Sequence, residues 1–199
     1  LEDFQQAAST LRIMIDLWPN EITYWEQLAS VNMLEGKLEN ALASLRVAFE
    51  VGLIQKESTI KSLVQLSIRQ GVPENSARVL ERSLKTGLVP EESEYFDLVA
   101  HAWREAREYE NAIMAHQTSA SLSETGEPFV RIADIHMKFN RWSQAEKALK
   151  KALDYDLSDE GKAWLLLGIT QSELLQFDAA RTSLRKARAQ KSTSKSAQK

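Results

Sequence analysis

Large and small apolar residues recur along the chain with a period of about 35 residues. A small residue that follows a short turn returns at intervals of 34, 35, 36, 33 and 35 residues, at Ala7, Ala41, Ser76, Ala112, Ala145 and Ala180. A large residue that opens the preceding segment returns at intervals of 35, 36, 33 and 35, at Trp25, Ile60, Phe96, Phe129 and Trp164. Two independent anchors with one period predict an array of structural repeats.

Each unit is predicted to form two helices. In the first helix a large apolar residue, another three positions on and then a small one share one face, as Trp164, Leu167 and Gly168 do. In the second helix a bulky residue is followed by a small one and then a large one, as in FDAARTSL (177–184). The aromatic stretches YWEQLA (24–29) and YFDLVA (95–100) are therefore interpreted as scaffold rather than as a ligand-binding box.

The expected domain organisation follows the repeat. Residues 1–21 would hold the second helix of a truncated unit, carrying Phe4, Ala7, Leu11 and Met14. Five full units at about 22–56, 57–92, 93–125, 126–160 and 161–190 would form one continuous solenoid. The polar segment 191–199 either starts a further helix or is a solvated terminus. Because the chain begins halfway through a unit, we expect it to be part of a longer array.

Composition narrows the possible functions. The chain is 43% hydrophobic and 27% charged, which is ordinary for a folded domain, and it contains no Cys, which excludes disulfides and thiolate-bound metals. Residues 178–199 hold seven Lys and Arg against one Asp, a net charge of +6. Since the whole chain has a net charge of −3, residues 1–177 carry −9. Most of the chain is therefore acidic, which disfavours contacts with nucleic-acid phosphates.

The segment WLLLGITQSELLQFDAARTSLRKA (164–187) resembles the tetratricopeptide repeat, with its Trp, Leu-Gly, Ala and later large apolar residue. The resemblance extends over residues 1 to about 190 and implies an all-α, right-handed α-solenoid of antiparallel helix pairs. The second full unit departs most, since Ile60, Val64 and Pro73 replace the usual residues. The slot where the family favours tyrosine holds Asn32, Ser67, Trp103, His136 and Gln171.

The resemblance also implies that the first helices line a concave groove, which binds peptides or helices of other proteins. Carried over slot by slot, the expected partner-binding residues are Glu26, Ser30, Met33, Lys61, Gln65, Ile68, Arg69, Glu94, Asp97, His101, Arg104, Val130, Asp134, Met137, Leu165, Ile169 and Ser172. Family members that bind chaperones hold a terminal carboxylate with Lys and Asn. Here Lys61 matches, but Gln65 and Leu98 stand in place of Asn, so a carboxylate clamp is not expected.

The expected groove changes character along its length. Its middle is charged, whereas Val130, Met137, Leu165 and Ile169 are apolar. Apolar side chains on such a face indicate a strip for an amphipathic segment. Alternatively, a helix C-terminal to the chain covers Leu165 and Ile169, and both interpretations stay open.

Enzymatic activity is not expected, and neither is a metal or a cofactor. The three histidines, His101, His116 and His136, show no metal-binding spacing, and the chain has no glycine-rich phosphate loop or nucleophile motif. His116 and His136 fall at inward-facing positions and are expected to be satisfied interior residues. His101 should face the groove near Asp97, where a surface contact is favoured over a metal site or proton transfer.

RNA binding is the alternative function, because pentatricopeptide repeats are also 35-residue helical pairs. The acidic balance opposes it, and the basic stretch in its favour (Arg181, Arg185, Lys186, Arg188, Lys191 and Lys195) is also typical of a solvated last helix or of a weak contact with acidic lipid. No apolar run is long enough to span a membrane. The sequence leaves open whether the chain forms a homo-oligomer.

A second, looser resemblance points to a biological setting. The phrases LWPNEITYWEQLA, GLIQKESTIKSLVQL, GVPENSARVLERSL and RWSQAEKALKKAL are similar to the C-terminal half of tetratricopeptide proteins associated with TonB–ExbB–ExbD systems of Gram-negative bacteria. The resemblance implies a periplasmic location and an accessory role in energy transduction. Without it, a cytoplasmic scaffold is the expectation.

Overall fold

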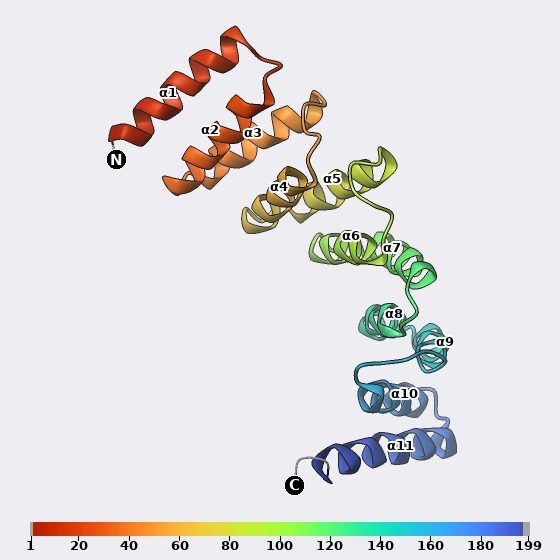
Figure 1. Ribbon diagram of the computed structural model, residues 1–199. Coiled ribbons are helices and arrows are strands. Elements are labelled where there is room, and N and C mark those ends of the chain that lie inside the picture. Colours follow the sequence, from red (N-terminus) through yellow and green to blue (C-terminus); the bar gives the residue numbers. More distant parts are fainter. Residues whose placement is uncertain (1, 197–199) are drawn as a thin grey trace. The chain divides into compact units, whose positions relative to one another are not determined.

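The computed structural model describes residues 2–196, and the side chains of residues 3–190, as an all-α repeat fold (Figure 1). Among these residues there is no strand, and one isolated parallel bridge joins Thr125 to Asp156. The helices are α1 (Glu2–Leu17), α2 (Ile22–Leu34), α3 (Leu38–Glu50), α4 (Glu57–Arg69), α5 (Pro73–Lys85), α6 (Ser93–Glu105), α7 (Tyr109–Leu122), α8 (Glu127–Lys138), α9 (Trp142–Ala152), α10 (Glu160–Glu173) and α11 (Phe177–Ser196). The predicted fold class, helix pairs repeated along the chain, is confirmed.

The helices form two compact units. Unit 1 comprises residues up to 91 together with 105–107, and it contains α1 to α5; unit 2 comprises residues 92–104 and those from 108 on, and it contains α6 to α11. In unit 1 each helix packs on the next along the chain, and in unit 2 the same holds from α7 to α11. Within unit 2, α6 and α8 lie on one side and α7 and α9 on the other, and α11 runs alongside α10 (Figure 1). The continuous right-handed superhelix stays a prediction.

The backbone of residues 191–196 continues α11 without a break. A separate helix therefore does not start within them, which differs from one of the two expectations for this segment. Residues 197–199 lie outside the described residues.

Small residues mark the crossings of the paired helices. Ala41, Ser76, Ala112 and Ala145 have no exposed surface, and Ala180 is 3% exposed. The absence of a bulky side chain at these positions lets the backbones approach closely, so that the large residues on either side interdigitate.

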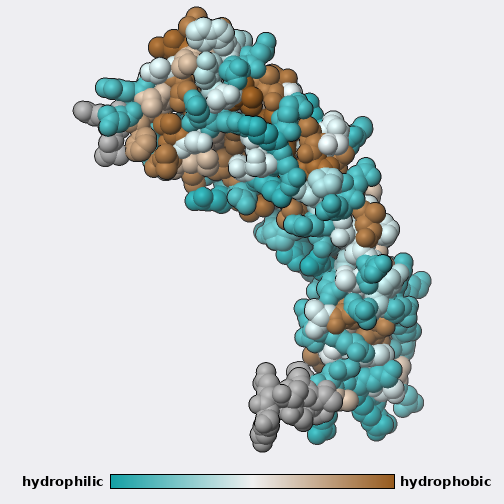
Figure 2. Space-filling view, viewed as in Figure 1, coloured by the Kyte–Doolittle hydropathy of each residue, from teal (hydrophilic) through white to brown (hydrophobic). Residues whose placement is uncertain are grey.

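In α1 the predicted pattern is only partly correct. Of Phe4, Ala7, Leu11 and Met14, only Leu11 is buried, and the core face of α1 is formed by Ala8, Leu11 and Ile15. The reason is that α1 packs on α2, whereas α3, the next second helix, lies between α2 and α4. Ile13 and Leu17 of α1 stay exposed, and Figure 2 shows hydrophobic patches over the region of α1 to α3.

The aromatic stretch at residues 24–29 has a structural role. Tyr24 and Trp25 pack against the cluster of Ala8, Leu11, Ile15 and Leu28. The indole Nε1 of Trp25 donates a 2.9 Å hydrogen bond to the carbonyl of Pro19, which fixes the α1–α2 connection. These aromatics join the two helices, as the repeat pattern predicts.

The turns inside the units share one geometry. Residues with positive φ stand at Gly36 (76°), Gly71 (69°), Arg107 (64°), Asn140 (55°) and Leu175 (60°). The next N–H donates to the carbonyl five residues back, from Lys37 to Asn32 and from Gln176 to Gln171 for example, as in a Schellman motif. Gly and Asn tolerate this left-handed conformation, whereas Arg107 and Leu175 are residue types that rarely adopt it.

The residues at the position where the family favours tyrosine make different buried hydrogen bonds in different repeats. Ser67 accepts a 2.8 Å hydrogen bond from the Asn75 amide and donates to the Leu63 carbonyl. Gln171 accepts a 2.8 Å bond from the Ser183 hydroxyl and donates to Glu146 at 3.3 Å, which joins α9, α10 and α11. The amide of Asn32 is buried without a partner among the described residues.

Gly168→Leu is expected to lower the free energy of unfolding by about 1–3 kcal/mol, because overpacking a tight crossing forces neighbours to shift. A Cβ at Gly168 would lie 2.7 Å from Leu184 Cγ and 3.3 Å from the Ala180 carbonyl oxygen. Chemical denaturation followed by circular dichroism measures the change. Ile169→Leu, at an exposed neighbour, should stay within about 0.5 kcal/mol of wild type; equal effects would contradict the assigned crossing.

Leu175→Gly is expected to raise the free energy of unfolding by about 0.5–1 kcal/mol. A left-handed conformation costs a non-glycine residue about 1–2 kcal/mol, part of which the greater freedom of Gly in the unfolded chain offsets. Little packing is lost, since the side chain is 72% exposed. The matched control Gly36→Ala should lower stability by about 1 kcal/mol. Loss of stability in Leu175→Gly would refute the assignment.

Candidate functional site

All the expected binding residues except Arg69 and Glu94 occupy three equivalent slots of the first helices. By repeat register, Glu26, Lys61, Asp97, Val130 and Leu165 share one slot, Ser30, Gln65, His101, Asp134 and Ile169 the second, and Met33, Ile68, Arg104, Met137 and Ser172 the third. None of these side chains is buried, and every member of the second slot is exposed. We call these residues the first-helix face, which is carried by α2 and α4 in unit 1 and by α6, α8 and α10 in unit 2.

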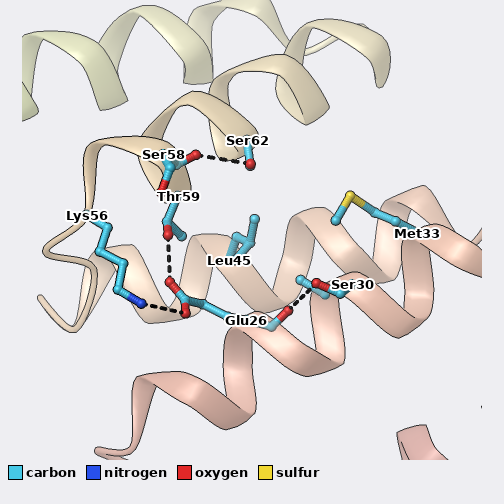
Figure 3. A pocket seen from close by; sticks show the side chains of 9 residues that line it. Glu26, Ser30, Met33, Leu45, Lys56, Ser58, Thr59 and Ser62 are labelled. Atoms are coloured by element: carbon cyan, nitrogen blue, oxygen red, sulfur yellow. Dashed lines mark hydrogen bonds and ion pairs between the residues drawn. The ribbon is translucent and has the colours of Figure 1, made fainter.

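In unit 1 part of this face forms a hollow of about 250 Å³ between α2 and α4 (Figure 3). Glu26, Ser30 and Met33 line it from α2, Ser58, Thr59 and Ser62 line it from α4, and Leu45 of α3 and Lys56, just before α4, complete the lining. The structure thus brings together the three residues predicted for the first full repeat, residues 22–56. The residues predicted on α4 do not line this hollow.

Glu26 connects the two helices. Its carboxylate accepts a 2.6 Å hydrogen bond from the Thr59 hydroxyl and lies 3.4 Å from Lys56 Nζ (Figure 3). Ser30 and Ser62 donate to carbonyls of their own helices, Glu26 and Ser58. Glu26 therefore contributes to repeat-to-repeat packing as well as to the surface.

The predicted residues on α4 lie on the exposed surface. Lys61, Gln65, Ile68 and Arg69 are all exposed. Lys61 Nζ lies 2.6 Å from Glu57, an i,i+4 pair on its own helix. The charge of Lys61 is thus balanced locally.

In unit 2 the middle of the face forms a larger hollow, of about 470 Å³. Glu94, Asp97, His101 and Arg104 line it from α6, together with Leu98, His116 of α7 and Arg131 of α8. The structure therefore brings together the four residues predicted for the third full repeat, residues 93–125. It adds Arg131 and His116, which were not expected to line the groove.

Asp97 pairs with residues of other helices rather than with His101. Its carboxylate lies 2.5 Å from Arg131 Nη1 and 3.2 Å from His116 Nδ1, and His101 lines the same hollow. Partial burial by itself would raise the pKa of Asp97, but the hydrogen bonds from His116 and Arg131 hold it below its ordinary value. His116 is 3% exposed and hydrogen-bonded, which confirms the prediction of a satisfied interior histidine.

A second charged group lies further along the face. Asp134 is exposed at the surface, but desolvation by the surrounding protein atoms raises the pKa of its carboxyl, and the nearby Lys162 and Arg104 oppose that rise. Cations and carboxylates from α6, α8 and α10 therefore approach one another along unit 2. Such a surface suits a polar partner with charges of both signs.

The apolar residues are the remaining part of the face. Leu165 is 37% exposed and Ile169 40% exposed, while Val130 and Met137 are half-buried. Leu165 also lines a hollow of about 350 Å³ between α10 and α11, with Leu184 and Ala187. Exposed aliphatic side chains beside charges are typical of surfaces that bind amphipathic segments.

Sequence reasoning missed the partners that join neighbouring repeats. Thr59 follows Glu26 by 33 residues and Arg131 follows Asp97 by 34, close to the repeat period. On the second helices, Arg82 pairs with Glu50 at a separation of 32 residues. The available signal in the sequence was pairs of complementary polar residues separated by about one repeat length.

His136 differs from its prediction as a satisfied interior residue. The side chain is half-buried, and its Nδ1 has no hydrogen-bond partner among the described residues. Burial, followed by the charge of Arg141, lowers the pKa of the imidazole, while Glu110 opposes this. In the described part of the chain no three His, Cys, Asp or Glu side chains are grouped so that they could hold a metal ion, and no helix is long and apolar enough to cross a membrane.

Comparison with known proteins supports the repeat assignment. The tetratricopeptide repeat family model matches residues 130–197, which confirms the resemblance for the part that contains α8 to α11. No curated protein matches the chain by sequence.

Solved structures share the fold over most of the chain. The crystal structure of MamA is similar with a TM-score of 0.64 and 15% identity, over 85% of this chain and 97% of that chain. YrrB, described as a TPR protein with an unusual peptide-binding site, has a TM-score of 0.59 and 15% identity, over 92% and 93%. BtubC from P. vanneervenii has a TM-score of 0.58 and 15% identity, over 98% and 90%. At such identities the similarity shows the fold alone.

Asp97→Asn is expected to lower the free energy of unfolding by about 1 kcal/mol at pH 7, because it weakens charge-assisted hydrogen bonds from Arg131 and His116. The folded state depresses the pKa of Asp97, so this stabilisation is complete above the ordinary value of 3.8 and is lost as the pH falls through the lowered pKa. Denaturation between pH 7 and pH 2 measures it. Glu94→Gln, at an exposed neighbour, is the control, and a difference that does not shrink in acid would contradict the ion pair.

Proposed function

We propose that the protein is a non-catalytic scaffold that binds a peptide or helix of a partner protein on the first-helix face. The observation that carries the proposal is that the same three slots are exposed or half-buried in every repeat, while neighbouring positions of the first helices, such as Ala29, Val64, Ala100 and Ala133, build the core. A surface that stability leaves free to vary is available for recognition. Peptide binding by YrrB, a protein of the same fold, supports the proposal.

The first-helix face of unit 2 is the part best suited to an amphipathic segment. Apolar contacts are available at Val130, Met137, Leu165 and Ile169, and Met in particular adapts to partners of different shape. The charges around Asp97 and Asp134 would fix the orientation of the segment. A helix or extended peptide with apolar residues at i, i+3, i+4 spacing, flanked by polar ones, has this chemistry.

RNA binding is disfavoured on charge. The cations of α11 are partly engaged, since Lys186 Nζ lies 3.9 Å over the ring of Trp164 and Arg181 lies 3.9 Å from Asp178. The side chains of Lys191 and Lys195 lie outside the described ones. Tight, salt-sensitive RNA retention in a low-salt filter-binding assay would reverse this ranking.

The association with a TonB–ExbB–ExbD system, and with it a periplasmic location, stays a proposal from the looser sequence resemblance. The neighbouring genes test it directly. A TonB-type gene cluster around the coding sequence would support the association, and a different neighbourhood would leave the scaffold proposal without this setting.

Met137→Glu combined with Ile169→Glu is expected to weaken binding of peptides selected on the wild-type chain from a displayed library by at least about tenfold, because carboxylates replace the apolar contacts. Fluorescence anisotropy with the selected peptides measures the affinity. Circular dichroism checks that the variant is folded.

Met114→Glu is the matched control. Met114 is a 63% exposed methionine on α7, outside the first-helix face of the same unit. Its variant should bind the selected peptides like wild type. If the selected peptides keep their affinity for the double variant but bind Met114→Glu more weakly, the binding surface lies on the second helices instead.

A further inference from the structure

A hollow of about 540 Å³ lies in unit 2 outside the first-helix face, where α7 and α9 flank α8. Phe129 and Ile132 of α8, 7% and 5% exposed, lie between Ala120 of α7 and Ala148 of α9. Tyr155, beyond the end of α9, closes one side, with its ring centroid 5.7 Å from that of Phe129. The hollow thus has apolar and aromatic walls.

The hollow exists because one large residue of the repeat is missing. Eight positions after the small anchor, four of the other second helices carry a large aliphatic or aromatic residue, namely Ile15, Phe49, Leu84 and Leu153, and the last, α11, carries Arg188. In α7 this position is Ala120. Since interiors are close-packed, a side chain removed from a conserved position of the packing leaves unfilled space.

Unit 1 shows what fills this position. Phe49 is 5% exposed, and the guanidinium of Arg82 lies over its ring at 5.0 Å from the centroid. Lys151 occupies in α9 the position that Arg82 occupies in α5, six residues after the anchor. Unit 2 therefore keeps the covering cation but lacks the ring, and Lys151 Nζ lies 4.4 Å over Phe129 instead.

Polar groups at the hollow select for negative charge. Lys147 and Lys151 are exposed on its rim, and no acidic side chain is among the described residues that line it. His136 also lines it and contributes the buried Nδ1 without a described partner. This nitrogen can exchange a hydrogen bond with a polar group of an incoming segment.

We propose that this hollow is a second docking site, which takes an aromatic side chain from an acidic segment of a partner protein. The aromatic ring would occupy the space that Phe49 fills in unit 1 and be covered by Lys151, while carboxylates beside it pair with Lys147 and Lys151. The site is separate from the first-helix face, so two partners, or two parts of one partner, would bind the chain at once.

The test uses the full chain and a fluorescein-labelled heptapeptide with a central Phe between two runs of Glu and Asp, followed by fluorescence anisotropy. Saturable binding that weakens with added salt is expected. Ala120→Leu should weaken it at least about tenfold by restoring the residue type of Leu84 and Leu153, so this variant is compatible with the fold. Lys147→Glu with Lys151→Glu should weaken it to a similar extent.

Controls separate this site from the first-helix face. Met137→Glu with Ile169→Glu should leave heptapeptide binding unchanged, whatever it does to other peptides. The proposal is overturned by absence of saturable binding, by wild-type affinity in Ala120→Leu, or by equal affinity for peptides with Ala in place of Phe or Gln in place of the acids. A dimer in sedimentation that Ala120→Leu dissociates would assign the hollow to a second copy of the chain instead.

Discussion

Close approach of paired helices at small residues is the constraint on which the rest of the structure depends. At Ala41, Ser76, Ala112 and Ala145 the side chain is fully covered, and at Gly168 even a Cβ would collide with Leu184. Without this approach the large residues of neighbouring helices do not interdigitate, and the apolar area that stabilises each unit is not buried. The same packing directs the three slots of the first helices outward, and these slots carry the proposed function.

The fold was predictable because this constraint leaves a signal in single residues. The small anchors and the large residues opening each first helix repeat with the same period, and the helix pairs follow them closely in the structure. Glu26, Ser30 and Met33 meet in one hollow, and Glu94, Asp97, His101 and Arg104 in another, because repeat register alone places equivalent side chains on one side. Register is a property of periodicity, which a single sequence shows.

Partners across repeats were not predictable in the same way. Asp97 pairs with Arg131 and His116, because helix packing brings side chains of α8 and α7 to 2.5 Å and 3.2 Å from its carboxylate. The left-handed conformations of Arg107 and Leu175 carry no residue signature, since the turn geometry is imposed by the helices on either side. The space at Ala120 has a signal in the sequence, a small residue at a position where four other second helices carry a large one, but its lining becomes evident only from the structure.

The differing polar contacts in the tyrosine-like slot bear on how such a chain evolves. Gln171 depends on Glu146 from the preceding unit and on Ser183 from its own, whereas Ser67 depends on Asn75. Moving the repeat that holds Gln171 away from the preceding one would separate its buried amide from Glu146, at a cost of about 1–3 kcal/mol for an unsatisfied group, whereas the Ser67–Asn75 contact lies within one repeat and would move with it. Although the backbone pattern is modular, side-chain contacts that cross from one repeat to the next make the order of the modules specific, so shuffling them is penalised.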